Sequence, residues 1–330
     1  MKYKDSKKIL KIIKRAKKIL INVHRNPDPD SIGSALAFYE YLIDLKKDVK
    51  VICPDKLSED NLFLPHSDKV EKVDFSNFNF NNYDLFLTLD SSSWSQVTAN
   101  PELKLPNINI LLIDHHITSQ KFGNTNLIDV TASSTSEMVY FLFKDWRVRL
   151  TSTINQNILA GIIGDTGVLR YPNVTPDTLS VVRDLMLNGA NKNEITEKLY
   201  RNYSFNGIKF WGEIIQRMEI DNNNRFVYSA IPYEIFEKFN FPYGSKEIAA
   251  SLFCSVVKDT DFGMIMIEEE KGILSVSFRS RKGFNVAEVA EALGGGGHIV
   301  AAGASIRNLN YKEAVEKVLL VAKKYAQKSN

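Results

Sequence analysis

Short runs of aliphatic residues alternate along the first half of the chain with longer segments in which apolar positions recur every three to four residues. Four such runs, at 19–23, 49–53, 85–89 and 110–113, have the length and composition of strands that are buried on both faces. A clear helical period follows the first of them, at 32–43, and further helical patterns follow the last. This alternation predicts an α/β fold whose N-terminal part is a mostly parallel sheet flanked by helices.

The pattern changes in the second half of the chain. Residues 190–222 are typical of amphipathic helices, and strand-like runs resume after a polar, Asn-rich turn. We therefore predict a first domain at 1–190, a helical linker at 191–224 and a smaller C-terminal α/β domain at 225–330. The elements expected in that last domain are strands at 226–231, 263–268 and 273–279 and helices at 286–293 and from residue 311.

Two helix starts can be predicted from capping residues. Asp30 or Ser31 is expected to cap the helix that follows the first strand. Ser134 and Glu137 have the spacing of a capping box ahead of another helix. Residues 54–83, in contrast, are mixed in character and predict no regular element.

Composition is that of an ordinary folded protein, with 330 residues of which 44% are hydrophobic and 25% charged. The net charge is only +3, but nine lysines and arginines against one aspartate lie in the first 20 residues, in an amphipathic basic helix. No apolar stretch approaches the length of a signal sequence or a membrane span, so we expect a cytoplasmic protein without membrane contact. Cys53 and Cys254 lie far apart in apolar segments and are predicted to be core residues.

Candidate chemistry lies where the predicted strands and one helix end. These ends supply His24, Asp28, Asp30, Asp90, His115 and Asp165. Because parallel strands bring their carboxyl ends to one edge of a sheet, we expect the six side chains to converge. Such a group is hard to bury without cations, and its mixed ligands favour Mn²⁺, with Mg²⁺, Fe²⁺ and Co²⁺ as alternatives. Six ligands suit two ions, the usual arrangement for attack on a phosphoryl group.

A second candidate site lies near the C-terminus. It comprises Arg279 and Ser280 at the end of an expected strand, and Gly294, Gly295, Gly296, Gly297 and His298. Four glycines more often form a flexible linker, but here apolar residues enclose them. Successive backbone N–H groups that can adopt either sign of φ make an anion-binding nest. We therefore favour a phosphate or nucleotide site over a linker.

In combination these residues resemble the motifs of the DHH phosphoesterases. The motifs are His24-x-Asn26-Pro27-Asp28-x-Asp30, Asp90, Asp114-His115-His116 and Asp165, and the segment from Arg279 to His298 resembles the DHH-associated substrate domain. The resemblance covers nearly the whole chain. It departs from the family pattern at Pro29, where a small residue is usual, and at 91–96, which lack an acid and an arginine.

The resemblance implies a role for each residue. Residues 1–190 would be the catalytic domain and 225–330 would bind substrate. The implied metal ligands are His24 and Asp28 for one ion and Asp30, His115 and Asp165 for the other, with Asp90 as a bridge. The implied catalytic residues are Asp114 and His116, of which His116 contacts the phosphate and protonates the leaving oxygen.

Within this family, the two-domain layout resembles oligoribonucleases that degrade nanoRNA and dephosphorylate pAp. This implies a Mn²⁺-dependent hydrolase that acts on short single-stranded RNA or small nucleotides. Cyclic di-AMP or pApA is an alternative substrate, and pyrophosphate is disfavoured because it leaves the second domain without a role. A non-catalytic RNA-binding protein that uses the basic helix is an alternative of a different class, and it leaves the six ligands unexplained. The oligomeric state stays open, with a homodimer as one alternative.

Overall fold

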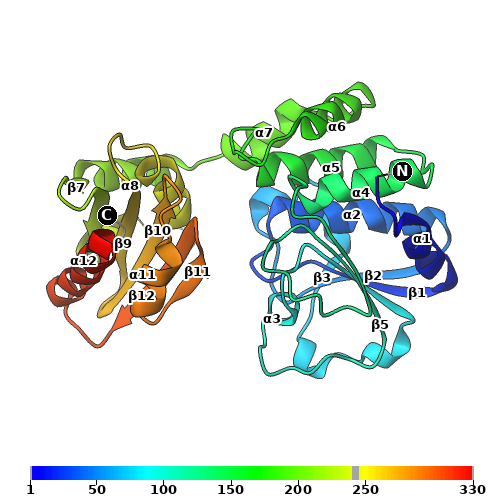
Figure 1. Cartoon of the computed structure of the whole chain (residues 1–330), viewed down its shortest axis with the longest axis horizontal. Helices are drawn as coiled ribbons and strands as arrows, with labels where there is room; N and C mark the ends of the chain where they lie inside the picture. The colour runs from blue at the N-terminus through cyan, green and yellow to red at the C-terminus, as the bar shows by residue number, and fades with distance from the viewer. Residues whose placement is uncertain (1, 240–244, 329–330) are drawn as a thin grey trace. The chain divides into compact units, whose positions relative to one another are not determined.

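The chain forms two compact units, Met1–Asn202 and Tyr203–Asn330, in a computed structural model that describes residues 2–239 and 245–328 (Figure 1). Each unit combines a β-sheet with packed helices and has its own apolar core, so the predicted α/β fold is confirmed. The division follows α7 (Lys192–Tyr200) and precedes α8 (Phe205–Gln216), inside the segment for which a helical linker is predicted. None of the helices in the described ranges has the length and apolar character that crossing a membrane requires.

The first unit is built on a six-stranded sheet with the order β3–β2–β1–β4–β5–β6, in which all neighbours are parallel. The strands are β1 (Lys18–Asn22), β2 (Asp48–Cys53), β3 (Val70–Lys72), β4 (Leu85–Leu89), β5 (Asn109–Asp114) and β6 (Thr125–Ile128). The order reverses between β1 and β4, and ligands of such sheets bind beyond the carboxyl ends of the strands at this switch point. The short strands β3 and β6 are not predicted by the sequence pattern.

Alternate residues of the strands pack into two layers. Ile19 and Ile21 of β1 belong to the core that contains the long helices, whereas Leu20 packs with Phe86 and Trp94 on the opposite face. Figure 1 shows α2, α4 and α5 on one side of the sheet and α3 on the other. The helices are α1 (Ser6–Arg15), α2 (Pro29–Asp44), α3 (Trp94–Thr98), α4 (Thr135–Asp145), α5 (Ser152–Asp165) and α6 (Pro176–Leu187). Because both faces are covered, the central strands β1, β4 and β5 are mainly apolar.

Helix α2 begins earlier than the sequence predicts. Its cap is Asp28, whose carboxylate accepts a hydrogen bond from the backbone N–H of Ser31 at 2.9 Å. The prediction that Asp30 or Ser31 caps this helix is therefore wrong, because Pro29 fits the first helical position, where no N–H is needed. Asp30 consequently lies inside the first turn. Helix α1 ends at Arg15 and β1 begins at Lys18, so the predicted basic helix does not extend over all of the first 20 residues.

The second unit has a mixed sheet with the order β11–β12–β10–β9–β8–β7, antiparallel except for the pair β8–β9. Helices α11 and α12 pack on one face, and α8 and α10 pack on part of the other. The elements are β7 (Glu219–Asp221), β8 (Phe226–Ile231), α9 (Tyr233–Phe236), α10 (Ser245–Ala249), β9 (Phe262–Glu270), β10 (Ile273–Ser280), α11 (Val286–Ala292), β11 (Gly296–His298), β12 (Ala301–Arg307) and α12 (Tyr311–Lys328).

Short helical turns complete the chain. They are η1 (Glu59–Asn61), η2 (Ser67–Lys69), η3 (Phe75–Asn77), η4 (Phe80–Asn82), η5 (Glu237–Phe239) and the π-helical turn η6 (Ala250–Cys254). Four of these turns and the strand β3 occupy 54–83, which explains why that segment shows no single hydrophobic period.

Candidate metal centre

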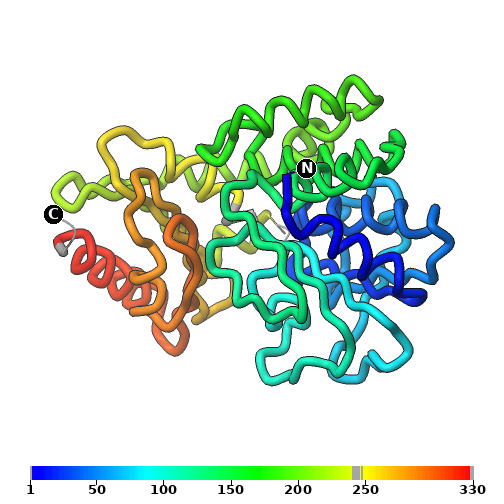
Figure 2. The backbone as a smooth tube through the Cα atoms, turned by 45° about the vertical axis from the view of Figure 1, so that its right-hand side comes forward, coloured from blue at the N-terminus to red at the C-terminus, as the bar shows by residue number. Residues whose placement is uncertain are grey.

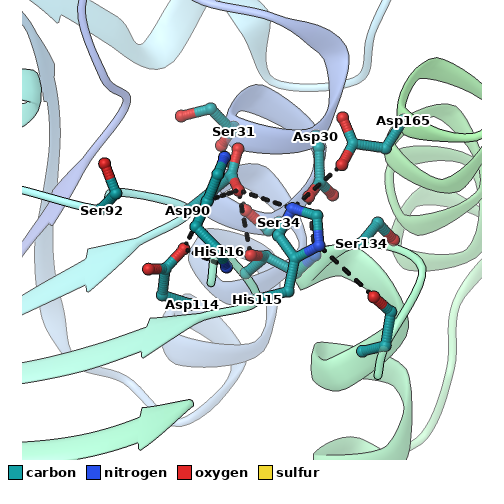
Figure 3. Close-up of polar contacts among 12 residues, drawn as sticks. Asp30, Ser31, Ser34, Asp90, Ser92, Asp114, His115, His116, Ser134 and Asp165 are labelled. Carbon is teal, nitrogen blue, oxygen red and sulfur yellow. Dashed lines mark hydrogen bonds and ion pairs between the residues drawn. The ribbon is translucent and has the colours of Figure 1, made fainter. Parts of the chain in front are cut away.

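The predicted ligands of the first unit lie together at the carboxyl edge of its sheet, at the switch point between β1 and β4 (Figure 3). Asn22, the last residue of β1, fixes this point. Its side-chain oxygen accepts the backbone N–H of Leu89 at 2.7 Å, and its amide donates to the hydroxyl of Ser91 at 3.0 Å. Because Asn22 is fully buried, these bonds hold the ends of β1 and β4 in register where the ligands leave the strands.

Asp90 occupies the centre of the group. Its carboxylate is 1% exposed, and its Oδ2 lies 3.4 Å from His24 Nε2 while its Oδ1 lies 3.6 Å from His115 Nε2. The Thr135 hydroxyl donates to Oδ1 at 3.1 Å. The backbone of Asp90 has φ = 53°, a left-handed conformation that aspartate tolerates better than most residues. Asp90 is therefore held from its backbone and its side chain, facing imidazoles on two sides.

His24 and Asp28 approach Asp90 from the loop after β1. His24 Nδ1 lies 2.7 Å from the backbone oxygen of Arg25, which only accepts hydrogen bonds, so Nδ1 carries a proton and Nε2 points at the carboxylates. Burial lowers the pKa of His24, but the charge of Asp28 and its hydrogen bond, followed by Asp90, outweigh burial and hold the pKa well above its usual value. Conversely, burial raises the pKa of Asp28, but His24 outweighs this and lowers it to about 2.

Asp30, His115 and Asp165 form the other side of the group. His115 Nε2 lies 3.0 Å from Asp165 Oδ2, at the last residue of α5. The two oxygens of the fully buried Asp30 accept the backbone N–H groups of Thr135 and Ser136, at 2.7 and 2.8 Å. These are the first N–H groups of α4, which favour a negative charge. Burial, followed by Asp90 and Asp165, raises the pKa of Asp30, as expected for crowded carboxylates without cations.

His116 is oriented by Asp114. His116 Nδ1 lies 2.7 Å from Oδ1 of the fully buried Asp114 and 3.7 Å from Oδ1 of Asp90. Burial lowers the pKa of His116, but the hydrogen bond to Asp114 and the charge of Asp90 raise it above its usual value. The Asp114 carboxylate thus fixes the ring and favours the imidazolium form, an arrangement suited to proton donation.

The N–H groups of Thr135 and Ser136 form a clamp on the Asp30 carboxylate, and these two residues were not predicted as functional from the sequence. The only signal of this clamp in the sequence is the capping-box spacing of Ser134 and Glu137, and the Ser134 side chain indeed caps α4 by accepting the N–H of Glu137 at 3.0 Å. The predicted reciprocal bond differs, because the Glu137 carboxylate accepts the N–H of Ser133 at 2.9 Å. Gly161 of α5 permits this packing, since a Cβ there would lie 2.6 Å from Asp30 Oδ1.

The donor set fits divalent cations. Ligand atoms fall into three groups that each lie within 4.8 Å: His24 with Asp28 and Asp90, Asp30 with His115 and Asp165, and Asp90 with His115 and His116. Buried carboxylates that repel one another need positive charge, and imidazole nitrogens beside carboxylate oxygens are ligands of Mn²⁺-like ions. Because Asp90 and His115 each belong to two groups, the set is suited to a pair of neighbouring ions.

In the second unit, the predicted substrate residues lie on two faces of the sheet. Arg279 of β10 and His298 of β11 are both paired with Ala301 of β12, so these residues share one face, whereas the adjacent Ser280 points to the other. The Arg279 guanidinium donates to the Ser251 hydroxyl at 2.8 Å. The register therefore brings Arg279 and His298 together across a small residue.

The glycine tract is an edge strand rather than a linker, because Gly296–His298 pairs with β12. Positive φ values occur at Gly294 (80°) and Gly297 (146°), and a Cβ at Gly295 would lie 2.1 Å from the backbone oxygen of Gly303. Gly296 has neither a positive φ nor a neighbour within 4 Å of its Cβ position. The backbone therefore requires a glycine at Gly294, Gly295 and Gly297, whereas a side chain would fit at Gly296. Anion binding by the tract stays a prediction.

Comparisons with known proteins agree with this geometry. Residues 18–162 match the DHH family, N-terminal domain, and residues 223–328 match the DHHA1 domain. The chain is 30% identical over 310 residues to the bifunctional oligoribonuclease and PAP phosphatase NrnA of Thermus thermophilus, covering 91% of this chain and 88% of that one. It is 28% identical over 293 residues to the protein of the same name from Bacillus subtilis, covering 87% and 89%. The exopolyphosphatase-related protein from Bacteroides fragilis shares the fold, with a TM-score of 0.90 at 24% identity over 98% of this chain and 96% of that chain.

Proposed function

This chain belongs to the DHH family, and from that premise we propose that it is a metal-dependent phosphoesterase that hydrolyses short oligoribonucleotides to 5′-mononucleotides and removes the 3′-phosphate from pAp. The names of the two NrnA relatives, which pair an oligoribonuclease with a PAP phosphatase, support both substrates. Both reactions break a bond between phosphorus and a 3′-oxygen. A single site that hydrolyses this bond therefore accounts for both activities.

The observation that carries the proposal is the buried carboxylate of Asp90, which faces His24 on one side and His115 on the other at 3.4 and 3.6 Å. In this proposal one ion is held by His24, Asp28 and Asp90, and the second by Asp30, Asp90, His115 and Asp165. When bound, such a pair lowers the pKa of the attacking water and stabilises charge on the phosphate oxygens. The donor set favours Mn²⁺ over Mg²⁺, because imidazole is a poor ligand for Mg²⁺.

The chain's own residues orient the reaction around this pair. The α4 N-terminus holds Asp30, and the Arg25 carbonyl holds His24, so two ligands are fixed before substrate arrives. His116, held as imidazolium by Asp114, donates its proton to the departing 3′-oxygen. Water supplies the hydroxyl that remains on phosphorus, so the products are a 5′-phosphate or free phosphate and a 3′-hydroxyl.

We assign nucleotide binding to the second unit. Arg279 and His298 are polar groups on one sheet face, and the tract Gly294–Gly297 lies exposed at the edge of the same sheet. Their proposed ligand is the terminal phosphate of the oligonucleotide or pAp. Binding of a terminus is consistent with a preference for chains only a few nucleotides long.

A substrate panel tests the function. The purified protein is assayed on an RNA dinucleotide, a 24-mer RNA, pAp, cyclic di-AMP and pyrophosphate, each with Mn²⁺, Mg²⁺, Co²⁺ or Fe²⁺ and with a chelator. We expect turnover of the dinucleotide and pAp with Mn²⁺, much slower cleavage of the 24-mer, and none with chelator. Faster turnover of cyclic di-AMP than of the dinucleotide would replace the substrate assignment with the cyclic dinucleotide alternative. Turnover that is unchanged by chelator would refute the metal centre itself.

A further inference from the structure

Helix α1 carries its charge on one continuous strip. Five cations, Lys7, Lys8, Lys11, Lys14 and Arg15, are exposed, and at 3.6 residues per turn they fall within an arc of about 120°. Ile9 and Ile13 on the opposite side are fully buried in the core of the first unit. Figure 2 shows α1, in dark blue, on the outside of that unit. We call these five residues the basic ridge.

The basic ridge has no counter-charge of its own. In the described part of the chain none of its five side chains forms an ion pair, and the first turn of α1 contains no acid. Lys47 adds a further cation at the end of the helix, where its ammonium donates to the backbone oxygens of Lys14 and Ala16 at 2.7 and 2.6 Å. The positive charge of this surface is thus left to solvent.

Helix stability accounts for Lys14 and Arg15, which stand in the last turn, but not for the other cations of the ridge. Lys7 and Lys8 stand in the first turn, where the helix dipole disfavours positive charge. Lys7 and Lys11, like Lys11 and Arg15, are like-charged pairs four residues apart, which destabilise a helix. A sequence that breaks these local rules without a compensating contact points to a ligand that supplies the missing negative charge.

The charge is also segregated along the chain. The first 20 residues hold nine basic residues and one acidic residue, a net charge of +8, whereas the whole chain has +3. The remaining residues therefore carry a net charge of −5. A strongly basic element on an otherwise acidic protein is typical of contact with a polyanion.

We propose that the basic ridge docks the phosphate backbone of RNA chains longer than those that the metal centre hydrolyses. The ridge has no exposed aromatic side chain for base stacking, so binding depends on phosphates and not on sequence. A membrane surface fits less well, because the apolar side of α1 is buried and cannot enter lipid. The proposal rests on the proposed function only for its choice of RNA as the polyanion.

The position of the ridge separates docking from hydrolysis. Helix α1 leads into the amino end of β1, where the N–H groups of Lys17 and Lys18 donate to Asp84, whereas the metal centre lies at the carboxyl ends of the strands. RNA bound at the C-terminal end of the ridge therefore lies near the sheet edge opposite the candidate catalytic residues. It holds the enzyme near longer RNA without being its substrate.

The test compares two four-lysine variants of the full chain. The ridge variant carries Lys7→Gln, Lys8→Gln, Lys11→Gln and Lys14→Gln, and the control carries Lys72→Gln, Lys104→Gln, Lys121→Gln and Lys198→Gln, all exposed in the same unit. Binding of a fluorescent 24-mer RNA is measured by anisotropy in chelator, which prevents hydrolysis, over a range of salt concentrations. We expect the ridge variant to bind at least tenfold more weakly, with a salt slope reduced by about 3, or 0.7 for each lost contact. The control should bind like wild type.

Two further measurements keep the result unambiguous. The ridge variant should have an equal or higher Tm, because like-charge repulsion is removed, and unchanged turnover of a dinucleotide with Mn²⁺. Wild-type affinity in the ridge variant, or an equal loss in the control, would overturn the proposal. Loss of binding to anionic phosphatidylserine vesicles in the ridge variant, without any loss for RNA, would assign the surface to a membrane instead. Because binding is measured without turnover, failure here is distinguishable from failure of the proposed activity.

Discussion

The two units present their candidate functional groups in opposite ways. In the first unit, carboxylates such as Asp30 and Asp90 are at most 1% exposed and are held by backbone and hydroxyl donors from α4. In the second unit, His298 and the glycine tract lie exposed on an edge strand. A buried group of charges cannot lose one member without leaving the others unbalanced, whereas an exposed subsite loses contacts one at a time. We therefore expect substitution of a single ligand in the first unit to abolish turnover, and substitutions in the second unit to lower it by degrees.

The largest effect is expected for Asp90→Asn. Asparagine fits the same volume and tolerates φ = 53°, so the change removes a charge that both proposed ions share while the backbone is kept. Metal catalysis contributes several kcal/mol, so kcat on a dinucleotide should fall by about a thousandfold or more. Asp68→Asn, an exposed acid of the same unit, is the control. A rate above a tenth of wild type would remove Asp90 from the centre of the mechanism.

His116→Ala should give the next largest loss. General acid catalysis contributes about 10²- to 10⁴-fold, so kcat on a dinucleotide should fall by at least about a hundredfold while metal content, measured by elemental analysis, stays normal. For a nucleotide p-nitrophenyl ester, whose leaving group needs no proton, kcat should fall much less. Asp114→Asn should reproduce this pattern, because a neutral amide in place of the carboxylate 2.7 Å from His116 Nδ1 no longer stabilises the imidazolium form. If metal is lost instead, His116 is a ligand and not the acid.

His298→Ala tests the graded behaviour of the second unit. Removing one charge-assisted hydrogen bond costs about 1.5 to 3 kcal/mol, so kcat/KM on pAp should fall about ten- to a hundredfold with metal binding unchanged. The variant should retain its slow hydrolysis of bis-p-nitrophenyl phosphate, because this substrate contains no nucleotide for the second unit to bind. Lys312→Ala on the exposed surface of the same unit is the control. An equal loss of kcat/KM on both substrates would mean that His298 takes part in catalysis. The two units would then not differ in the way proposed here.

The smallest effect is expected within the glycine tract, where neighbouring positions differ. Gly297→Ala places a Cβ 2.5 Å from Ala302 Cα on a backbone with φ = 146°, while Gly296→Ala meets open space. Strain of roughly 1 to 3 kcal/mol should shift the edge strand and lower kcat/KM by about tenfold or less at position 297. Position 296 should behave like wild type. The kcat/KM of both variants is measured on pAp in parallel steady-state assays. A wild-type kcat/KM in both variants would mean that the tract does not bind substrate.

The convergence of the candidate ligands can be predicted from the sequence because its signals are local. His24, Asp90 and His115 each lie just after a mainly apolar run, and parallel pairing then brings the ends of such runs to one edge of the sheet. The helix break at Asp165 is marked by flanking glycines. Each of these positions can be read from a window of a few residues.

The groups that hold the ligands in place cannot be predicted from a short window of the sequence. The clamp on Asp30 comes from Thr135 and Ser136, more than 100 residues away, and depends on how closely α5 approaches α2 and α4 at Gly161. The glycine tract has the same limitation, because only its pairing with β12 shows which glycines need a positive φ. Long-range packing decides these details, and hydrophobic periodicity carries no information about it.

The division of the chain also sets the order in which its parts are made. All six proposed ligands lie within Met1–Asn202, and the cores of this unit contain no residue from the second. The ribosome adds the remaining 128 residues, 330 minus 202, at 5 to 20 per second, which takes roughly 6 to 26 s. During this interval the emerged first unit can fold and take up its ions from the cell. The proposed metal site can therefore form before the unit to which we assign nucleotide binding has been made.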